Sequence, residues 1–93
     1  MTPSEPISVP LGSVVATPAV LEALTRADIV TALRRHAVGD WGDVTPDDRN
    51  ANDEALRSGD RLLSVYSSAT GTKFWVLTEA DRSATTVLLP DDY

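Results

Sequence analysis

The sequence predicts a single small α+β domain: an antiparallel β-meander of three to four strands with two or three helices packed on one face. Three observations predict it. The C-terminal third holds three strand-like runs separated by short polar or glycine-containing turns, which is typical of a meander. Two Thr-Pro pairs, at Thr17 and Thr45, precede these runs and are typical helix starts. The run Phe74–Leu77 is apolar throughout, so we expect a central strand with little solvent on either face.

Composition bounds the class of protein. At 93 residues the chain can bury one modest core, and we place the domain at 11–93, after an extended N-terminal arm at 1–10 that contains three prolines. The absence of cysteine excludes disulfides and thiolate metal sites. The sequence shows neither a signal-peptide pattern nor an apolar run of membrane-spanning length, so we expect a cytoplasmic protein.

The first half predicts one strand and a helical region. Residues 11–16 include β-branched side chains, so they are predicted to form a short strand. Thr17, followed by a proline, is expected to be an N-cap. A further helix start is predicted at Thr25, because Asp28 follows it three residues later, as in a capping box. Whether 18–36 is one bent helix or two is left open by the pattern.

The middle of the chain predicts a surface helix. Trp41 lies between two glycines. Its large apolar side chain is costly to expose to solvent in a small domain, so we expect it to fill the edge of the core. Thr45 is the predicted N-cap of a mostly polar helix at about 46–57, and Gly59 is expected to end it. So few apolar residues lie on this helix that it should sit on the surface.

The last third predicts the meander itself. Strands are expected at 61–67, 73–79 and 84–90, joined by a glycine-containing loop at 68–72 and a polar turn at 80–83. The same order of elements occurs in the small RelE-like and barnase-like nuclease folds. The similarity concerns only the order of the elements along the chain, so it is weak evidence for a shared function.

Four blocks of the chain resemble a family of small bacterial proteins found on chromosomes and on plasmids or integrative elements. The blocks are residues 11–18 (LGSVVATP), 35–42 (RHAVGDWG), 52–56 (NDEAL) and 75–93 (WVLTEADRSATTVLLPDDY). Members are usually called plasmid-related proteins, and some carry the name type I restriction subunit M. A methyl-donor-binding Rossmann domain does not fit in this length, and no glycine-rich strand-to-helix motif is present. The resemblance therefore implies an association with mobile elements and no mechanism.

Segment 40–54 is strongly acidic, with only Arg49 opposing it. The acids that we predict to bind a partner are Asp40, Asp43, Asp47, Asp48, Asp53 and Glu54. Such charges on a polar helix can imitate nucleic-acid phosphates and occupy a binding groove on another protein, although an ordinary solvated helix face has the same composition. Our leading hypothesis is a small acidic, non-catalytic interaction module of mobile elements that acts on host nucleic-acid machinery, such as a restriction or other defence system.

The alternative hypothesis is a metal-independent ribonuclease of RelE-like or barnase-like type. It uses His36, the only histidine, as the general base and Arg82 on the phosphate, with Thr85 or Tyr66 as a hydroxyl partner. The formal net charge of −6 opposes it, because such enzymes need a basic groove for the nucleic-acid backbone.

Metal ions and cofactors are not expected. The acids Asp40, Asp43, Asp47 and Asp48 do not have the spacing of a calcium loop, and helix caps explain the last two. The expected partner is a protein, such as a nucleic-acid-binding enzyme; direct nucleic-acid binding is not expected, and the oligomeric state is left open.

Overall fold

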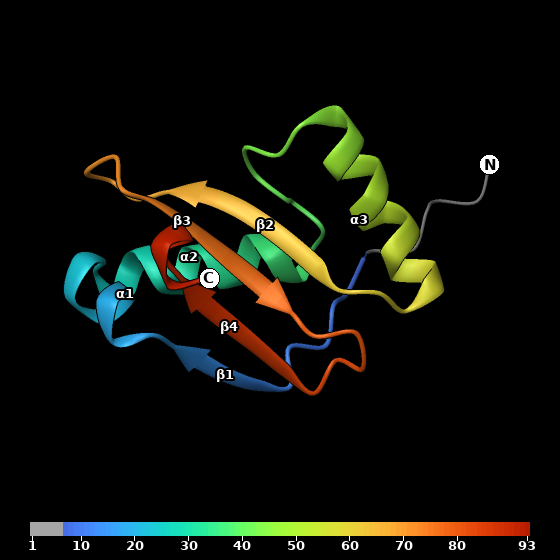
Figure 1. Ribbon diagram of the computed structural model, residues 1–93, viewed down its shortest axis with the longest axis horizontal. Helices are drawn as coiled ribbons and strands as arrows, with labels where there is room; N and C mark the ends of the chain where they lie inside the picture. Colours follow the sequence, from blue (N-terminus) through green and yellow to red (C-terminus); the bar gives the residue numbers. More distant parts are fainter. Residues whose placement is uncertain (1–6) are drawn as a thin grey trace.

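The computed structural model describes residues 7–93, which form a four-stranded sheet, three α-helices and a C-terminal 3-10 turn (Figure 1). The strands are β1 (Ser13–Ala16), β2 (Leu62–Ser67), β3 (Lys73–Thr78) and β4 (Ala84–Leu88). The helices are α1 (Pro18–Ala23), α2 (Arg26–Ala37), α3 (Pro46–Ser58) and the 3-10 turn η1 (Pro90–Asp92). The predicted α+β class is confirmed, and the segment 18–36 contains two helices.

The sheet has the strand order β1-β4-β3-β2. Its last three strands form the predicted antiparallel meander, with Val76 of β3 opposite Val87 of β4. β1 adds a fourth strand that runs parallel to β4, with Val14 opposite Thr85, so the sheet is mixed instead of purely antiparallel. A parallel pair needs a long crossover between its strands, and residues 17–83 supply it.

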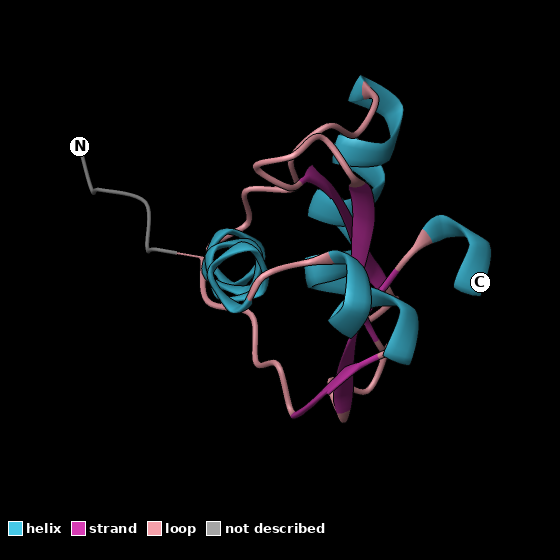
Figure 2. Ribbon diagram, turned by 90° about the vertical axis from the view of Figure 1, so that its left-hand side faces the viewer, coloured by secondary structure: helices cyan, strands magenta, loops and turns pink. Residues whose placement is uncertain are grey.

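The helices take different positions around the sheet. Figure 2 shows α2 on one face of the sheet and η1 on the other, where the rings of Trp75 and Tyr93 meet edge to face at 5.7 Å. α1 closes the end of the sheet, and its Val20 is buried in the same core as α2. α3 lies beside β2 at the edge of the sheet, because its apolar stripe is as narrow as the sequence predicts.

The helix starts follow the predicted caps. The hydroxyls of Thr17, Thr25 and Thr45 each accept a hydrogen bond from a backbone N–H in the first turn of α1, α2 and α3. Asp28 completes the capping box with Thr25. Gly59 ends α3 in the left-handed region at φ 83°. These local predictions are confirmed.

The core has two clusters of buried side chains. The first joins α1 and α2 to the sheet through Val20, Leu24, Ala32, Tyr66, Phe74, Val76 and Val87. The second lies under α3 and contains Val9, Trp41, Ala55 and Leu62. Trp41 is 3% exposed, which confirms that it fills the edge of the core. The backbone N–H of Val9 donates to the carbonyl of Ala37 at 2.8 Å, so this end of the N-terminal arm is held on α2; residues 1–6 of the arm lie outside the described residues.

The outer edge of β2 is covered by other parts of the chain. The Asn52 side chain of α3 donates to the Leu63 carbonyl at 2.8 Å and accepts from the Leu63 N–H at 3.1 Å, as a neighbouring strand would. Two residues further along, the Val65 N–H donates to the Trp41 carbonyl at 3.0 Å, and the Val65 carbonyl accepts from the Asp43 N–H at 2.7 Å. Because these backbone groups of β2 already have partners, another strand cannot pair with them.

Candidate functional site

His36, the predicted general base, points from the last turn of α2 into the interior. Its side chain is fully buried and its ring meets Trp41 edge to face, with the centroids 5.5 Å apart. Nδ1 lies 2.6 Å from the hydroxyl of Ser64 on β2, and Nε2 lies 2.8 Å from the hydroxyl of Thr78 on β3. Both ring nitrogens therefore have a strand hydroxyl as partner and neither faces solvent.

The hydrogen-bond chain beyond His36 determines where its proton sits. Thr85 donates its hydroxyl proton to the Leu11 carbonyl at 2.8 Å. In its 2.7 Å contact with Thr78 it must therefore accept, which makes Thr78 the donor. Thr78 has no second proton, so it accepts from Nε2–H of His36. Nδ1 is then unprotonated and accepts from the hydroxyl of Ser64. With a neutral imidazole, both ring nitrogens therefore have a suitable partner.

Burial is the main cause that lowers the pKa of His36 to about 4, and the positive charge of Arg82 lowers it further. At neutral pH such a group is the neutral tautomer that the network requires. A proton on Nδ1 would require the Ser64 hydroxyl to turn from donor to acceptor, and burial disfavours the charged ring that would result. His36 thus serves to join α2 to the sheet.

Stability should therefore fall as the pH falls through the range from 6.5 to about 4. In this window the unfolded chain binds a proton at His36 and the folded chain does not, so the free energy of unfolding decreases toward low pH. The shift of about 2.5 corresponds to a loss on the order of 3 kcal/mol. Urea unfolding at a series of pH values measures it. A His36→Leu variant should lack this dependence between pH 4 and 6.5; an equally steep curve in the variant would contradict the assignment.

Arg82, the predicted phosphate ligand, is occupied by backbone carbonyls. One guanidinium nitrogen donates to the carbonyl of Asp60 at 2.6 Å and a second to that of Ala55 in α3 at 3.0 Å. The residue has a positive φ of 62°, which the turn between β3 and β4 requires. A cation near the last turn of α3 also suits the helix dipole. Arg82 therefore ties this turn to the end of α3.

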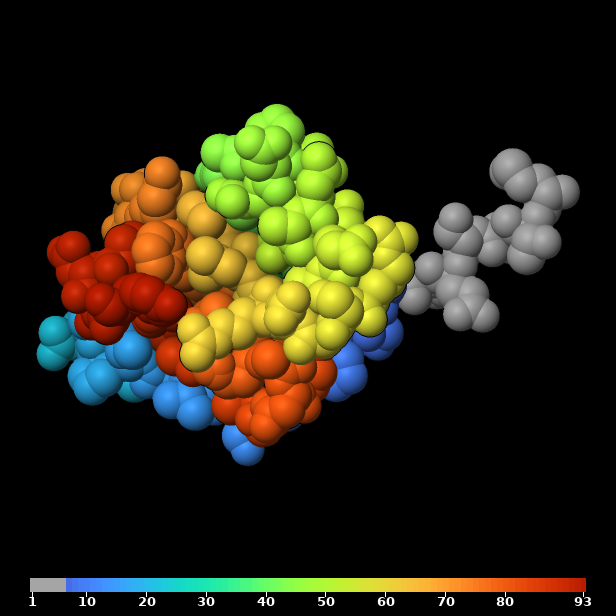
Figure 3. All heavy atoms as spheres, turned by 45° about the vertical axis from the view of Figure 1, so that its right-hand side comes forward, coloured from blue at the N-terminus to red at the C-terminus, as the bar shows by residue number. Residues whose placement is uncertain are grey.

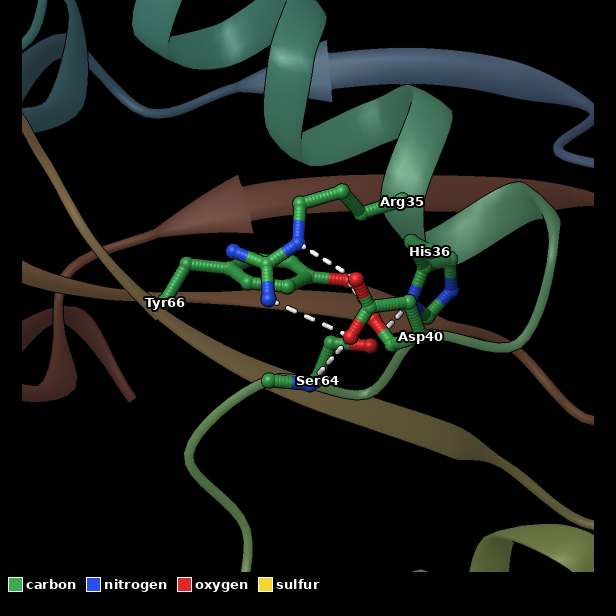
Figure 4. A network of polar contacts seen from close by, with 6 residues as sticks. Arg35, His36, Asp40, Ser64 and Tyr66 are labelled. Atoms are coloured by element: carbon green, nitrogen blue, oxygen red, sulfur yellow. Dashed lines mark hydrogen bonds and ion pairs between the residues drawn. The ribbon is translucent and has the colours of Figure 1, made fainter.

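Tyr66, the predicted hydroxyl partner, lies close to His36 and Ser64 but binds the loop after α2 (Figure 4). Its hydroxyl donates to the Asp40 carbonyl, and the guanidinium of Arg35 lies 4.6 Å from its ring centroid. Arg35 also forms an ion pair with the Asp40 carboxylate at 2.7 Å. Burial raises the pKa of Tyr66 to about 12. This cluster fixes the loop after α2 against β2.

The four residues of the ribonuclease hypothesis do not share an open site. His36 reaches Thr85 only through Thr78, in a network without solvent access. Arg82 and Tyr66 each bind other partners. A general base needs hydrogen-bond reach to a substrate proton, and no substrate atom can approach a ring whose two nitrogens are buried on strand hydroxyls. The arrangement supports structural roles for all four.

Two members of this network, Ser64 and Thr78, escape the sequence-based site prediction. A weak signal for them exists in the strand pattern. Ser64 alternates with Leu62 and Tyr66 on the inward face of β2, and Thr78 follows Phe74 and Val76 inward on β3. A polar residue at an inward position needs a partner, and the single histidine of the adjacent helix is the natural one.

The acidic residues predicted to bind a partner do lie on one part of the surface. They occupy α3 and the loop before it, which form a projecting ridge in Figure 3. Three of them are engaged within the domain: Asp40 with Arg35, Asp53 as acceptor from the Trp41 indole at 3.1 Å, and Glu54 with Arg57 at 3.0 Å. Within residues 7–93, the other three form no ion pair: Asp43, Asp47 and Asp48.

A polar hollow lies beside these acids. It has a volume of about 310 Å³ and is lined by residues 39–42 together with Arg49 and Asp53. The pKa of Asp40 at its wall is lowered, first by the hydrogen bond from Arg35, so this carboxylate stays charged at neutral pH. Asp40 is paired with Arg35, and Arg49 also lines the hollow, so positive and negative groups alternate around it.

The described part of the chain contains neither a group of three or more metal-ligating side chains nor a helix long and apolar enough to cross a membrane. The fold and these surfaces define a small α+β domain with a buried polar network and an acidic ridge. No family model, curated protein or solved structure matches the chain. The resemblance to plasmid-related proteins therefore stays a prediction.

Proposed function

We propose that this protein is a non-catalytic acidic interaction module that docks on the basic, nucleic-acid-binding surface of a partner protein. The observation that carries the proposal is the placement of Asp43, Asp47 and Asp48 on one exposed ridge, where none of them forms an ion pair within residues 7–93. A set of fixed negative charges on a rigid helix is complementary to a groove built for phosphates.

The distribution of cations supports a protein partner over a nucleic acid. Four of the eight lysines and arginines are engaged within residues 7–93: Arg35, Arg57 and Arg61 lie within ion-pair distance of carboxylates, and Arg82 is held by carbonyls. The net charge of −6 leaves a surface that repels a phosphate backbone. In line with the family resemblance, the partners we propose belong to host nucleic-acid machinery, such as a restriction or other defence system met by a mobile element.

The test removes the three unneutralised charges without disturbing the fold. The variant carries Asp43→Asn, Asp47→Asn and Asp48→Asn, while Asp53 is kept because it binds the Trp41 indole. The immobilised protein is exposed to a bacterial lysate, and bound proteins are identified after elution with salt or with duplex DNA. We expect the wild type to retain nucleic-acid-binding proteins that DNA displaces. The triple variant should retain at least about tenfold less, because long-range attraction weakens with each charge removed.

A matched control changes the same net charge elsewhere. Glu22→Gln, Asp81→Asn and Asp91→Asn together also take the chain from −6 to −3, at positions on α1, the β3–β4 turn and η1. This control should retain the partners. Equal retention by both triple variants, or equal loss in both, would show that the ridge is not the docking surface.

A further inference from the structure

β1 is an edge strand whose outer backbone groups have no partner among residues 7–93. Ser13 N–H donates to the Ser83 carbonyl at 3.0 Å and Thr17 N–H to the Val87 carbonyl at 3.1 Å, so odd-numbered residues of β1 face β4. Alternate residues of a strand point their backbone groups in opposite directions. Val14 and Ala16 therefore present their N–H and C=O groups outward along the lower edge of the sheet in Figure 1.

The same strand carries apolar side chains at the surface. Val14 is 48% exposed and Val15 is 50% exposed, one on each face of the sheet. No charged residue occurs between Ile7 and Leu21, in a chain with 24% charged residues. The nearest acid contact, Asp92 on the Thr17 hydroxyl, lies past the end of the strand. β1 is short, at four residues, but within residues 7–93 it lacks the other usual devices that protect an edge: charge, an internal proline or a covering segment.

The two edges of the sheet are thus opposite in character. The β2 edge is covered by Asn52 and by the loop at 41–43, and the acidic ridge lies beside it. The β1 edge, at the other end of the sheet, is open and uncharged. An assembly through β1 can therefore add one further strand there, and it cannot continue at β2.

We infer that β1 is a homodimer interface, at which two copies of this chain pair their β1 strands antiparallel about a two-fold axis. The charge distribution favours this edge over the rest of the surface as the place where two copies meet, and the outward residues Val14 and Ala16 are symmetric about Val15, as a two-fold pair requires. The protein has a net charge of −6, so two copies repel each other at most surfaces, whereas the β1 edge is uncharged and holds the two acidic ridges at the far ends of the joined sheet. A symmetric pair closes on itself.

The register follows from which residues face outward. Val14 of one copy exchanges both backbone hydrogen bonds with Ala16 of the other, and the axis passes between the two Val15 residues. This places the Val15 side chains directly opposite each other on the face away from α2, at the close spacing of a non-hydrogen-bonded pair. The dimer presents two acidic ridges, so a partner with two basic sites would gain avidity.

The experiment exploits the self-pairing of Val15. Sedimentation equilibrium over a concentration series should show the wild type approaching twice its 10.0 kDa monomer mass. Val15→Lys and Val15→Glu each place like charges opposite each other at the axis, which should raise the dimer dissociation constant at least about tenfold. An equimolar mixture of the two variants places opposite charges there and should recover a dimer.

A control at an equally exposed valine tests for general surface effects. Val38 is 61% exposed at the end of α2, and Val38→Lys should leave the dimer unchanged. Circular dichroism of each variant checks that the monomer is folded, which is expected because half of the Val15 side chain is already in water. A wild type that stays monomeric at every concentration overturns the inference. So does a dimer that survives both charged variants, or a mixture of the two that fails to associate.

Discussion

Replacing His36 with alanine should lower the free energy of unfolding by at least about 4 kcal/mol, because the substitution acts on packing and on hydrogen bonding together. It removes a fully buried ring from beside Trp41, and large-to-small changes of this kind cost roughly 3–5 kcal/mol. It also leaves the Ser64 hydroxyl buried without its partner, and such a group costs about 1–3 kcal/mol. A small domain has roughly 5–15 kcal/mol in total, so much of its stability depends on one side chain.

Urea unfolding followed by circular dichroism measures this loss, and two further observations test its cause. His36→Leu keeps most of the volume and loses only the hydrogen bonds, so it should cost about half as much. Nitrogen NMR of the wild type at neutral pH should show the proton on Nε2, as the donor order through Thr78 and Thr85 requires. A proton on Nδ1, or an alanine variant as stable as the wild type, would contradict the network.

Features that depend on neighbours in the chain could be predicted from the sequence. The caps at Thr17, Thr25 and Thr45 need only the three residues that follow them, and the glycine at 59 needs only the end of its own helix. The meander follows from strand-like runs with short turns between them, since such strands pair with their neighbours. Class, element order and the burial of Trp41 were therefore predictable.

The rest depends on pairings between distant residues, which local patterns do not encode. The parallel placement of β1 beside β4 joins segments about seventy residues apart, as does the hydrogen bond from Thr85 to Leu11. Asn52 looks like any polar residue of a surface helix until β2 lies next to it. His36 has the ordinary chemistry of a general base, and only its burial on Ser64 and Thr78 gives it another role.

The acidic ridge shows the same division between local and distant information. Composition located the charges on the polar helix and the loop before it, and the structure places them there. Which of them are engaged could not be predicted, because Asp53 meets the Trp41 indole and Asp40 meets Arg35 only after the loop has packed on β2. The unneutralised set is therefore smaller than the sequence alone predicts, and the proposed function depends on Asp43, Asp47 and Asp48.

Replacing Gly42 with alanine should lower the free energy of unfolding by about 4 kcal/mol. Gly42 has a φ of 77° and forms a parallel bridge with Val65, at the point where the loop after α2 crosses the edge of β2. A Cβ at this position would overlap the Val65 carbonyl oxygen and lie 2.7 Å from the Tyr66 ring. The left-handed conformation alone costs roughly 1–3 kcal/mol for a residue with a side chain. Relief of the overlap must further separate the loop from the strand, which breaks the hydrogen bonds that Val65 exchanges with Trp41 and Asp43.

Gly71 provides the matched control for this substitution. It has a similar positive φ of 88°, but a Cβ there meets no atom within 4 Å, so Gly71→Ala bears the conformational cost alone, about 1 kcal/mol. Urea unfolding of both variants isolates the steric contribution as their difference, which should be about 3 kcal/mol. Gly42→Ala should also expose Trp41 and shift its fluorescence to longer wavelength, because the loop that buries the indole can no longer reach β2. Equal losses in the two variants would mean that the loop can move off β2 at little cost. The loop would then not prevent another strand from pairing with β2, and strand addition would not be limited to β1.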